Sequence, residues 1–216
     1  QVRTVINVGA GAGSYEPADL TVMAIEPSWE MIRQRPAGTA PVIQAVAEQL
    51  PFRDASFDAA LAILTVHHWK AQAAGLAELG RVARQRVVVL TWDPACGDAF
   101  WLTARYLPEI VTLDVQRFPS MEEFARRLGN IHVEPLPVPH DCQDGFMGAF
   151  WRRPEAYLDP HVYRAMSGFA QLAPGIVQAG LTRLADDLGS GRWDALFGWL
   201  RRQETADLGY RLIVAQ

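Results

Sequence analysis

Cysteine is scarce in this sequence: Cys96 and Cys142 are the only two among 216 residues. Two cysteines are too few to form a disulfide scaffold in a chain of this length. The composition therefore fits a reducing compartment, and we expect a cytoplasmic protein. A metal site built from Cys96, His140 and Cys142 is disfavoured because their spacing matches no zinc-ligand pattern. We therefore expect no bound metal.

Lysine is almost absent as well. Lys70 is the only one, and the arginines are scattered among acidic residues. The formal net charge is −4, and no run of basic residues occurs anywhere in the chain. A protein that grips a nucleic-acid backbone usually carries a basic stripe. The charge pattern therefore argues against a nucleic-acid partner.

Long hydrophobic runs are also missing. The longest, at 59–66, has the length of a strand, well short of the ~18 residues that a membrane-spanning helix needs. No signal peptide is recognisable, so we expect no membrane partner. The chain starts at Gln1 and enters a strand pattern almost at once, from which we expect a natural N-terminal segment to precede it. Nothing in the sequence indicates an oligomeric state.

The first half of the chain alternates short β-rich runs with helix-like stretches, which is typical of a parallel sheet covered by helices. The run at 57–65 is apolar without alternation, as expected for a central strand buried on both faces. Ser28 is a suitable N-cap for a helix that Pro36 would end. Strands are predicted at 3–8, 20–25, 41–45, 57–65 and 86–91, with helices at 28–35 and 71–82.

The second half of the chain is mostly helical. We predict a helix at 98–107 and another from Ser120 to about position 129, where Glu123 would complete a capping box. A strand at 131–138 is interrupted by prolines, so it should lie at a sheet edge. A helical region and a final strand at 209–214 follow.

Three alternating glycines follow the first predicted strand directly, at the point where a helix should begin. Gly9, Gly11 and Gly13 would let the backbone turn tightly and approach a ligand closely. An ordinary strand-to-helix turn would look similar. A dinucleotide fingerprint would place its third glycine at position 14, where the chain has Ser14. The spacing favours a ligand without a pyrophosphate.

A carboxylate ends the second predicted strand, beside the glycine turn. Ligands of open α/β sheets lie just outside the carboxyl ends of the strands. Glu26 would stand at that edge and could accept hydrogen bonds from both hydroxyls of a ribose. The alternative is a solvated acid near a turn. Because Glu26 occurs together with the glycine turn, a role in binding a ribose is favoured.

Several blocks together resemble a known family. GAGAGSYEP, AIEPSWEMI, AEQLPFRDASFDAAL, TVHHW and RVARQRVVVLTWDP follow in order within the first 94 residues. They look like the small-molecule type of class I S-adenosylmethionine-dependent methyltransferases. The resemblance implies a Rossmann-like α/β fold: a seven-stranded, mostly parallel sheet with helices on both faces, an antiparallel last strand and a helical insertion before it.

The resemblance also implies a division of the chain. A single domain at 1–216 would contain a cofactor-binding core at 1–140, a helical insertion at 141–207 and a terminal strand at 208–216. The insertion is rich in aromatic residues, among them Phe146, Trp151 and Tyr157. These rings can form a small core under surface helices, or line a lid that closes over the acceptor.

The family motif assigns roles in binding S-adenosylmethionine. Residues near the methionyl part and the sulfonium would be Gly9, Ala10, Gly11, Leu64 and Thr65. Residues holding the ribose and adenine would be Glu26, Pro27, Ala47 and Glu48. Two positions depart from the motif: Asn7 stands where an acid commonly orders the amino group, and Val46 stands where an aspartate commonly meets the adenine amine.

Two histidines are candidates for a catalytic base. His67 and His68 follow the fourth predicted strand, and imidazole titrates near neutrality. At most one of them should face the pocket, where it could deprotonate a hydroxyl or thiol acceptor. Both can instead be structural, because methyl transfer can proceed by alignment alone.

The expected activity is transfer of a methyl group to a small-molecule acceptor by direct in-line displacement. The alternatives are a non-catalytic S-adenosylmethionine-binding module and a nucleotide-dependent oxidoreductase.

Overall fold

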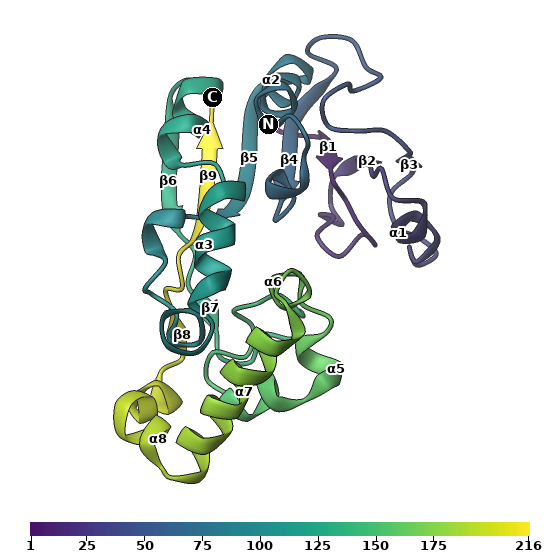
Figure 1. Cartoon of the computed structure of the whole chain (residues 1–216). Coiled ribbons are helices and arrows are strands. Elements are labelled where there is room, and N and C mark those ends of the chain that lie inside the picture. The colour runs from purple at the N-terminus through teal and green to yellow at the C-terminus, as the bar shows by residue number, and fades with distance from the viewer. The chain divides into compact units, whose positions relative to one another are not determined.

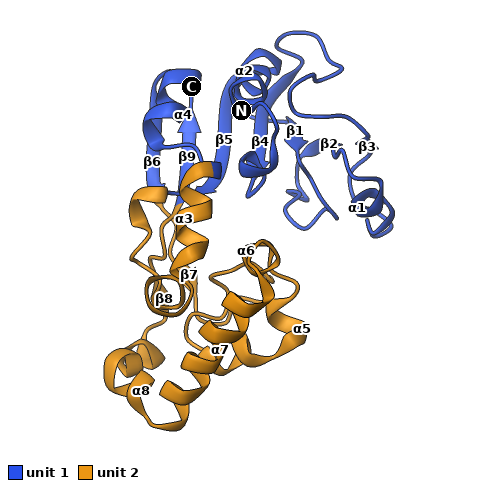
Figure 2. Ribbon diagram, in the orientation of Figure 1, with its two compact units in different colours: residues 1–93, 117–134, 211–216 blue, residues 94–116, 135–210 orange.

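The computed structural model describes residues 1–216 and divides into two compact units (Figures 1 and 2). Unit 1 comprises Gln1–Asp93, Arg117–Glu134 and Arg211–Gln216. Unit 2 comprises Pro94–Gln116 and Pro135–Tyr210. The range predicted for the helical insertion, 141–207, lies inside unit 2, which takes a further segment from the chain between the fifth and sixth strands of the sheet.

A seven-stranded sheet forms the centre of unit 1, with the order β3-β2-β1-β4-β5-β9-β6 (Figure 1). Its strands are β1 (Thr4–Val8), β2 (Thr21–Ile25), β3 (Val42–Ile43), β4 (Phe57–Ile63), β5 (Ala83–Trp92), β6 (Ile131–Pro135) and β9 (Tyr210–Ala215). The pairs from β3 through β2, β1 and β4 to β5 are parallel. The predicted fold class is therefore confirmed.

The strand order reverses direction between β1 and β4. From β1 the chain moves outward to β2 and β3 on one side, then returns to β4 and β5 on the other. At such a switch point the connections diverge and leave a crevice outside the carboxyl ends of the strands. The topology therefore places the expected binding site at the ends of β1, β2 and β4.

Helices α1 (Trp29–Arg33), α2 (Gln72–Val82) and α4 (Met121–Leu128) accompany this sheet. Leu76 and Leu79 of α2 and Phe124 of α4 are fully buried in one core with apolar side chains of the strands. The hydroxyl of Ser120 accepts from Glu123 N at 3.2 Å, which confirms the predicted N-cap of α4.

Two expectations for unit 1 were wrong. No helix follows the glycine turn: residues 9–20 form only turns and bends before β2 begins. The few residues between the two strands leave little room for a helix and its two connections. The predicted strand at 131–138 ends at Pro135, because proline cannot donate to the ladder. Val138, the last residue of the predicted strand, belongs to a separate strand, β7 (Val138–Pro139), which pairs with β8 (Thr205–Ala206). The sixth strand does lie at the sheet edge, as predicted.

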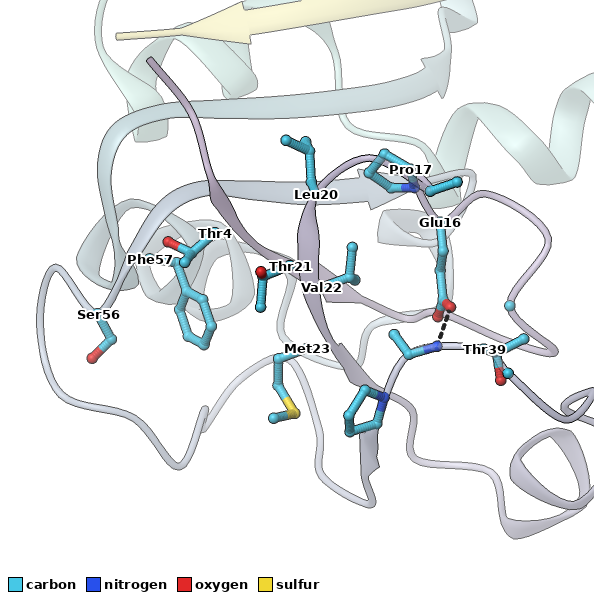
Figure 3. Close-up of a pocket in the computed structure, with 15 residues that line it drawn as sticks. Thr4, Glu16, Pro17, Leu20, Thr21, Val22, Met23, Thr39, Ser56 and Phe57 are labelled. Carbon is cyan, nitrogen blue, oxygen red and sulfur yellow. Dashed lines mark hydrogen bonds between the residues drawn. The ribbon is translucent and has the colours of Figure 1, made fainter.

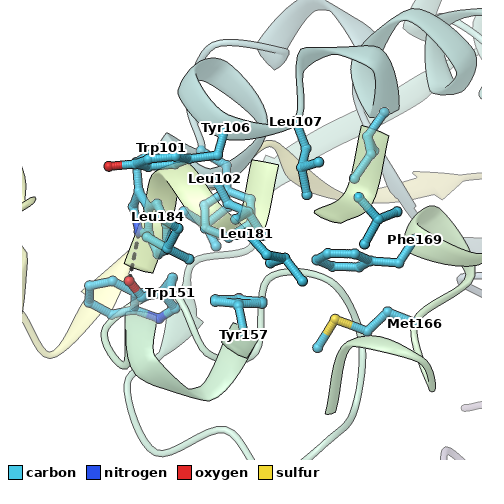
Figure 4. Close-up of a cluster of buried hydrophobic side chains, with 14 of the residues drawn as sticks. Trp101, Leu102, Tyr106, Leu107, Trp151, Tyr157, Met166, Phe169, Leu181 and Leu184 are labelled. Atoms are coloured by element: carbon cyan, nitrogen blue, oxygen red, sulfur yellow. Dashed lines mark hydrogen bonds between the residues drawn. The ribbon is translucent and has the colours of Figure 1, made fainter. Parts of the chain in front are cut away.

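Unit 2 has a hydrophobic core of its own (Figure 4). Its longest helix is α7 (Pro174–Gly189), accompanied by α3 (Pro108–Arg117), whose final residue is assigned to unit 1, and by α5 (Pro160–Tyr163), α6 (Ser167–Ala170) and α8 (Arg192–Phe197). Trp151 and Tyr157 are fully buried, and Trp151 O accepts from Trp101 Nε1 at 2.8 Å. The helix predicted at 98–107 is a π-helical turn, Leu102–Tyr106. The aromatic residues thus form a core, and a lid function for the insertion stays a prediction.

None of the helices is both long and apolar enough to span a bilayer.

Candidate functional site

The glycine turn after β1 has a backbone that only glycine adopts readily. Gly9, Gly11 and Gly13 have φ values of 74°, 53° and 92°, which lie in the region where a Cβ is disfavoured. Gly9 N and Ala10 N both donate to Ile25 O of β2, at 2.8 and 2.9 Å. The turn is therefore tied to the end of the neighbouring strand, and its backbone lines the crevice.

Glu26 is fixed at the end of β2 by two backbone groups. Its Oε2 accepts from Gly11 N at 2.8 Å, and its Oε1 accepts from Ser28 N at 2.9 Å. The residue is 7% exposed. A carboxylate oxygen can accept more than one hydrogen bond, so each oxygen can still receive a hydroxyl of a ligand. The two backbone bonds hold the carboxylate in place before a ligand arrives.

A cavity of about 620 Å³ lies at the carboxyl ends of β1, β2 and β4. Its volume falls within the roughly 300–1,000 Å³ of small-molecule sites. The lining residues are Gly9, Ala10, Gly11, Ala12, Ser14, Tyr15, Glu26, Pro27, Met31, Ala45, Val46, Ala47, Glu48, Ile63, Leu64, Thr65, His68, Trp69 and Lys70.

The structure brings together every residue expected to bind the cofactor except Asn7. Asn7 is 2% exposed and lies within β1, opposite Ala24 and Leu61 of the neighbouring strands, and it is not among the residues that line the cavity. Sequence reasoning missed Met31 and Trp69, which also line the cavity. Met31 stands one helical turn beyond the Ser28 cap, and this spacing could have indicated it.

One wall of the cavity is held by a short chain of contacts. Trp69 Nε1 donates to Thr65 Oγ1 at 3.3 Å. A Cβ on Gly75 of α2 would lie 2.4 Å from Trp69 Cε3, so the indole packs directly on the helix backbone. Leu64, just before Thr65, has a φ of 50°, which is uncommon for a residue other than glycine. Trp69 thus links Thr65, the residue after this bend, to α2.

Only one of the two histidines reaches the cavity, and it is His68. Its Nδ1 lies 3.5 Å from Arg117 Nη2. Partial burial and the positive charge of Arg117 lower the pKa of His68, while the Glu26 carboxylate opposes that shift. Because its ordinary value is 6.5, His68 is neutral at pH 7 and can accept a proton.

His67 turns away from the cavity and packs into the protein. Its ring stacks on Phe118 with 4.1 Å between centroids, and its buried Nδ1 has no hydrogen-bond partner. Burial, together with the positive charges that His68 and Arg117 can carry, lowers the pKa of His67 to about 3. His67 is therefore a neutral packing residue at any pH near neutrality.

A second cavity in unit 1, of about 630 Å³, lies beside β2 (Figure 3). Its walls are mostly apolar, with Leu20, Val22, Met23 and Phe57 among them. Glu16 lines it, but the carboxylate is already engaged by Ala40 N at 2.7 Å, the bond drawn in Figure 3, and by Arg35. No uncommitted acid or base faces this space, so we place the candidate site in the first cavity.

Comparison with known proteins points to one family. Residues 6–91 match the family model described as a methyltransferase domain. A solved structure described as a methyltransferase from an antibiotic biosynthesis pathway of Anabaena variabilis is 31% identical, with a TM-score of 0.89. The alignment covers 100% of this chain and 91% of that one. No curated protein sequence matches significantly.

More distant structures share the fold. An S-adenosylmethionine-dependent methyltransferase of Thermotoga maritima is 16% identical with a TM-score of 0.56, over 100% of this chain and 82% of that one. The plantazolicin methyltransferase BamL is 16% identical with a TM-score of 0.53, over 100% and 77%. Its structure contains a triazolic desmethyl analogue of plantazolicin and S-adenosylhomocysteine.

Proposed function

Because this chain belongs to the class I S-adenosylmethionine-dependent methyltransferases, we propose that it methylates a small-molecule acceptor by direct in-line displacement. The observation that carries this proposal is the pairing of the Gly9–Gly13 turn with a pre-positioned Glu26 at one cavity. S-adenosylmethionine, when bound, supplies an electrophilic methyl group on a sulfonium. Family membership argues against the nucleotide-dependent oxidoreductase.

The residues present fit this cofactor. Both oxygens of Glu26 are oriented by backbone N–H groups and can accept the ribose hydroxyls. Gly9 allows the turn to contact Thr65 where a Cβ would fill the space. Pro27, Ala47 and Glu48 line the part of the cavity assigned to the adenine. The side chain of Glu48 accepts from Ala71 N at 3.0 Å, so Glu48 would border the ring with its backbone.

The protein's contribution to the reaction is alignment and, for some acceptors, proton removal. Holding two reactants in line can supply several kcal/mol of the barrier. A hydroxyl or thiol acceptor must also lose a proton. His68 lines the cavity and is neutral at pH 7, so its imidazole can take that proton. Arg117 favours the neutral form of His68, which is the form that can accept a proton.

A small-molecule acceptor is supported by the size of the cavity and by the charge of the chain. The net charge of −4 and the scattered arginines provide no basic surface for a nucleic acid. BamL, which shares this fold, is known in complex with a small triazolic compound. The acceptor itself can be sought by a thermal-shift screen of metabolites with S-adenosylhomocysteine present, since ligands of the native state raise its stability.

One observation favours a second candidate, a module that binds S-adenosylmethionine without turnover. Val46 lines the cavity and is 47% exposed. It stands where family members commonly carry an aspartate for the adenine amine, and its side chain cannot accept a hydrogen bond. Turnover with an acceptor found in the screen distinguishes the two candidates.

Calorimetry tests the binding site. The parent protein should bind S-adenosylmethionine or S-adenosylhomocysteine, and NAD much more weakly or not at all. Glu26→Ala should weaken binding by ~1–3 kcal/mol, because the ribose hydroxyls lose their acceptors. Asp19→Ala removes the same charge from the exposed part of the β1–β2 connection and should bind as the parent does. Equal affinity of Glu26→Ala and the parent would show that the ribose lies elsewhere.

A further inference from the structure

The glycine turn of this chain lacks its usual support. In doubly wound folds the turn after the first strand leads into a helix, whose first turn holds the glycines in place. Here residues 9–20 contain no helix. Something else must hold Gly11 N against Glu26 Oε2, the contact that orients the candidate ribose acceptor.

Arg35 provides the missing support from the other side of Gly11. Its Nη1 donates to Gly11 O at 3.2 Å, and its Nη2 donates to Ala40 O at 3.0 Å. Gly11 is thus held at its N–H by Glu26 and at its C=O by Arg35. The planar guanidinium reaches two separate loops at once, as its fork of donors allows.

Glu16 completes this arrangement. One carboxylate oxygen pairs with Arg35 Nη2, and the other accepts from Ala40 N at 2.7 Å. The side chains of Arg35 and Glu16 are 4% and 9% exposed. A buried charge is tolerated only when it is paired and hydrogen-bonded. Each member therefore requires the other, and the pair joins the glycine turn to the loop before β3.

Gly13 makes room for this pair. Its φ is 92°, and a Cβ there would lie 3.3 Å from Arg35 Nη1 and 3.1 Å from Thr39 Cγ2. Gly13 does not line the candidate cofactor cavity. The third glycine of the motif is thus explained by the approach of Arg35 and Thr39, whereas Gly9 and Gly11 face the cavity.

We propose that Arg35 and Glu16 are positioning residues for S-adenosylmethionine. The buried pair takes the place of the absent helix and holds Gly11 in contact with the Glu26 carboxylate. This inference rests on the proposed function. The pair touches no part of the cavity, so it acts only through the backbone of the glycine turn.

Arg35→Lys tests the proposal with little risk to folding. Lysine keeps a positive charge opposite Glu16, but its single nitrogen cannot reproduce the fork that reaches both Gly11 O and Ala40 O. The Kd for S-adenosylhomocysteine, measured by calorimetry well below every variant's Tm, should rise about fivefold or more. Arg35→Gln also leaves the Glu16 carboxylate unpaired, so its Kd should rise further, by about tenfold or more, and its Tm should fall.

Asp58→Asn is the matched control for a purely structural effect. Asp58 is 8% exposed and accepts from Arg84, Thr4 N and Thr4 Oγ1 at the amino ends of β4 and β1, the opposite edge of the sheet from the cavity. Its loss should lower Tm and leave the Kd within about twofold of the parent, as expected for distant sites.

The outcomes separate the two proposals. If the parent does not bind S-adenosylhomocysteine, the proposed function fails and this inference fails with it. If the parent binds and Arg35→Lys binds within about twofold of it, the positioning role alone is overturned. If Arg35→Gln does not fold, Arg35→Lys decides the question.

Discussion

Gly9 and Thr65 approach each other so closely that a Cβ at position 9 would lie 1.9 Å from Thr65 Oγ1. The contact joins the turn after β1 to the residue after Leu64, beyond the end of β4. No side-chain rotation removes the clash entirely, because Thr65 Cβ would also lie only 2.7 Å away. The candidate site is therefore shaped by close contact between the Gly9 backbone and the Thr65 side chain, which lie on two loops that are distant in sequence.

Gly9→Ala should damage both the fold and the site. The added Cβ meets Thr65, and the φ of 74° disfavours any side chain. We expect the free energy of unfolding to fall by ~1–3 kcal/mol, and the Kd for S-adenosylhomocysteine to rise about tenfold or more. Denaturant titration and calorimetry measure these two quantities.

Gly80→Ala is the corresponding control within α2. A Cβ there meets nothing within 4 Å, so alanine should raise helix stability by ~0.5–1 kcal/mol without changing the Kd. A Gly9→Ala protein that is as stable as the parent and binds as tightly would show that the two loops separate easily.

His68→Ala should lower kcat by ~10²–10⁴-fold for a hydroxyl or thiol acceptor, and leave cofactor affinity intact. His67→Phe keeps a ring against Phe118 and should retain the parent kcat, since His67 does not line the cavity. Steady-state kinetics with the acceptor found by screening gives both values. Unchanged kcat in His68→Ala would mean that this enzyme works by alignment alone.

Arg117→Gln should move the pH profile of kcat/KM toward higher pH. The pKa of His68 lies below 6.5, so with His68 as the base the profile should rise below that pH and be flat at neutrality. Arg117 lowers this pKa by disfavouring the imidazolium. Removing its charge therefore raises the pKa, and the rising limb should shift with it. A profile that stays in place would argue against a link between Arg117 and the base.

Asp58 should make the stability of unit 1 sensitive to acid. The Arg84 guanidinium and the backbone N–H groups of Thr4 and Arg3 hold the pKa of Asp58 well below its ordinary 3.8. A carboxyl whose folded pKa is depressed stabilises the fold above its unfolded pKa, and that contribution is lost as the pH falls toward the folded value.

The parent's Tm should therefore drop as the pH is lowered from 5 to 2, and part of that drop should disappear in Asp58→Asn. The control is Asp19→Asn, because Asp19 is exposed. This variant should show the same decrease in Tm between pH 5 and pH 2 as the parent. If Tm decreases by the same amount in Asp58→Asn and in the parent, the sensitivity to acid comes from other carboxyl groups.

Those features that depend on residues close together in the chain could be predicted from the sequence. The glycine turn, the Ser120 cap and the place of Glu26 after a strand follow from local backbone preferences and from the rule that strands end at one edge. The edge position of β6 followed from its prolines. The seven-stranded fold came from the resemblance of the motif blocks to a family.

Features that depend on distant residues could not be predicted. Arg35 and Gly11 are separated by 24 positions, and no periodicity links them. The absence of a helix after Gly13 was not predicted, because a glycine-rich turn of this kind usually precedes a helix. Which histidine faces the cavity depends on the short helical turn Val66–His68, which the sequence pattern did not indicate.

The place of β9 has a consequence for synthesis of the protein. β9 is the last strand of the sheet to leave the ribosome, yet it lies between β5 and β6 (Figure 1). Between the end of β6 and the start of β9 the ribosome must translate the whole stretch from Pro135 to Tyr210, which takes on the order of 4–15 s at typical elongation rates. During that interval β6 has no neighbour in the sheet and β5 has an open edge, which is the state most exposed to pairing with other nascent chains.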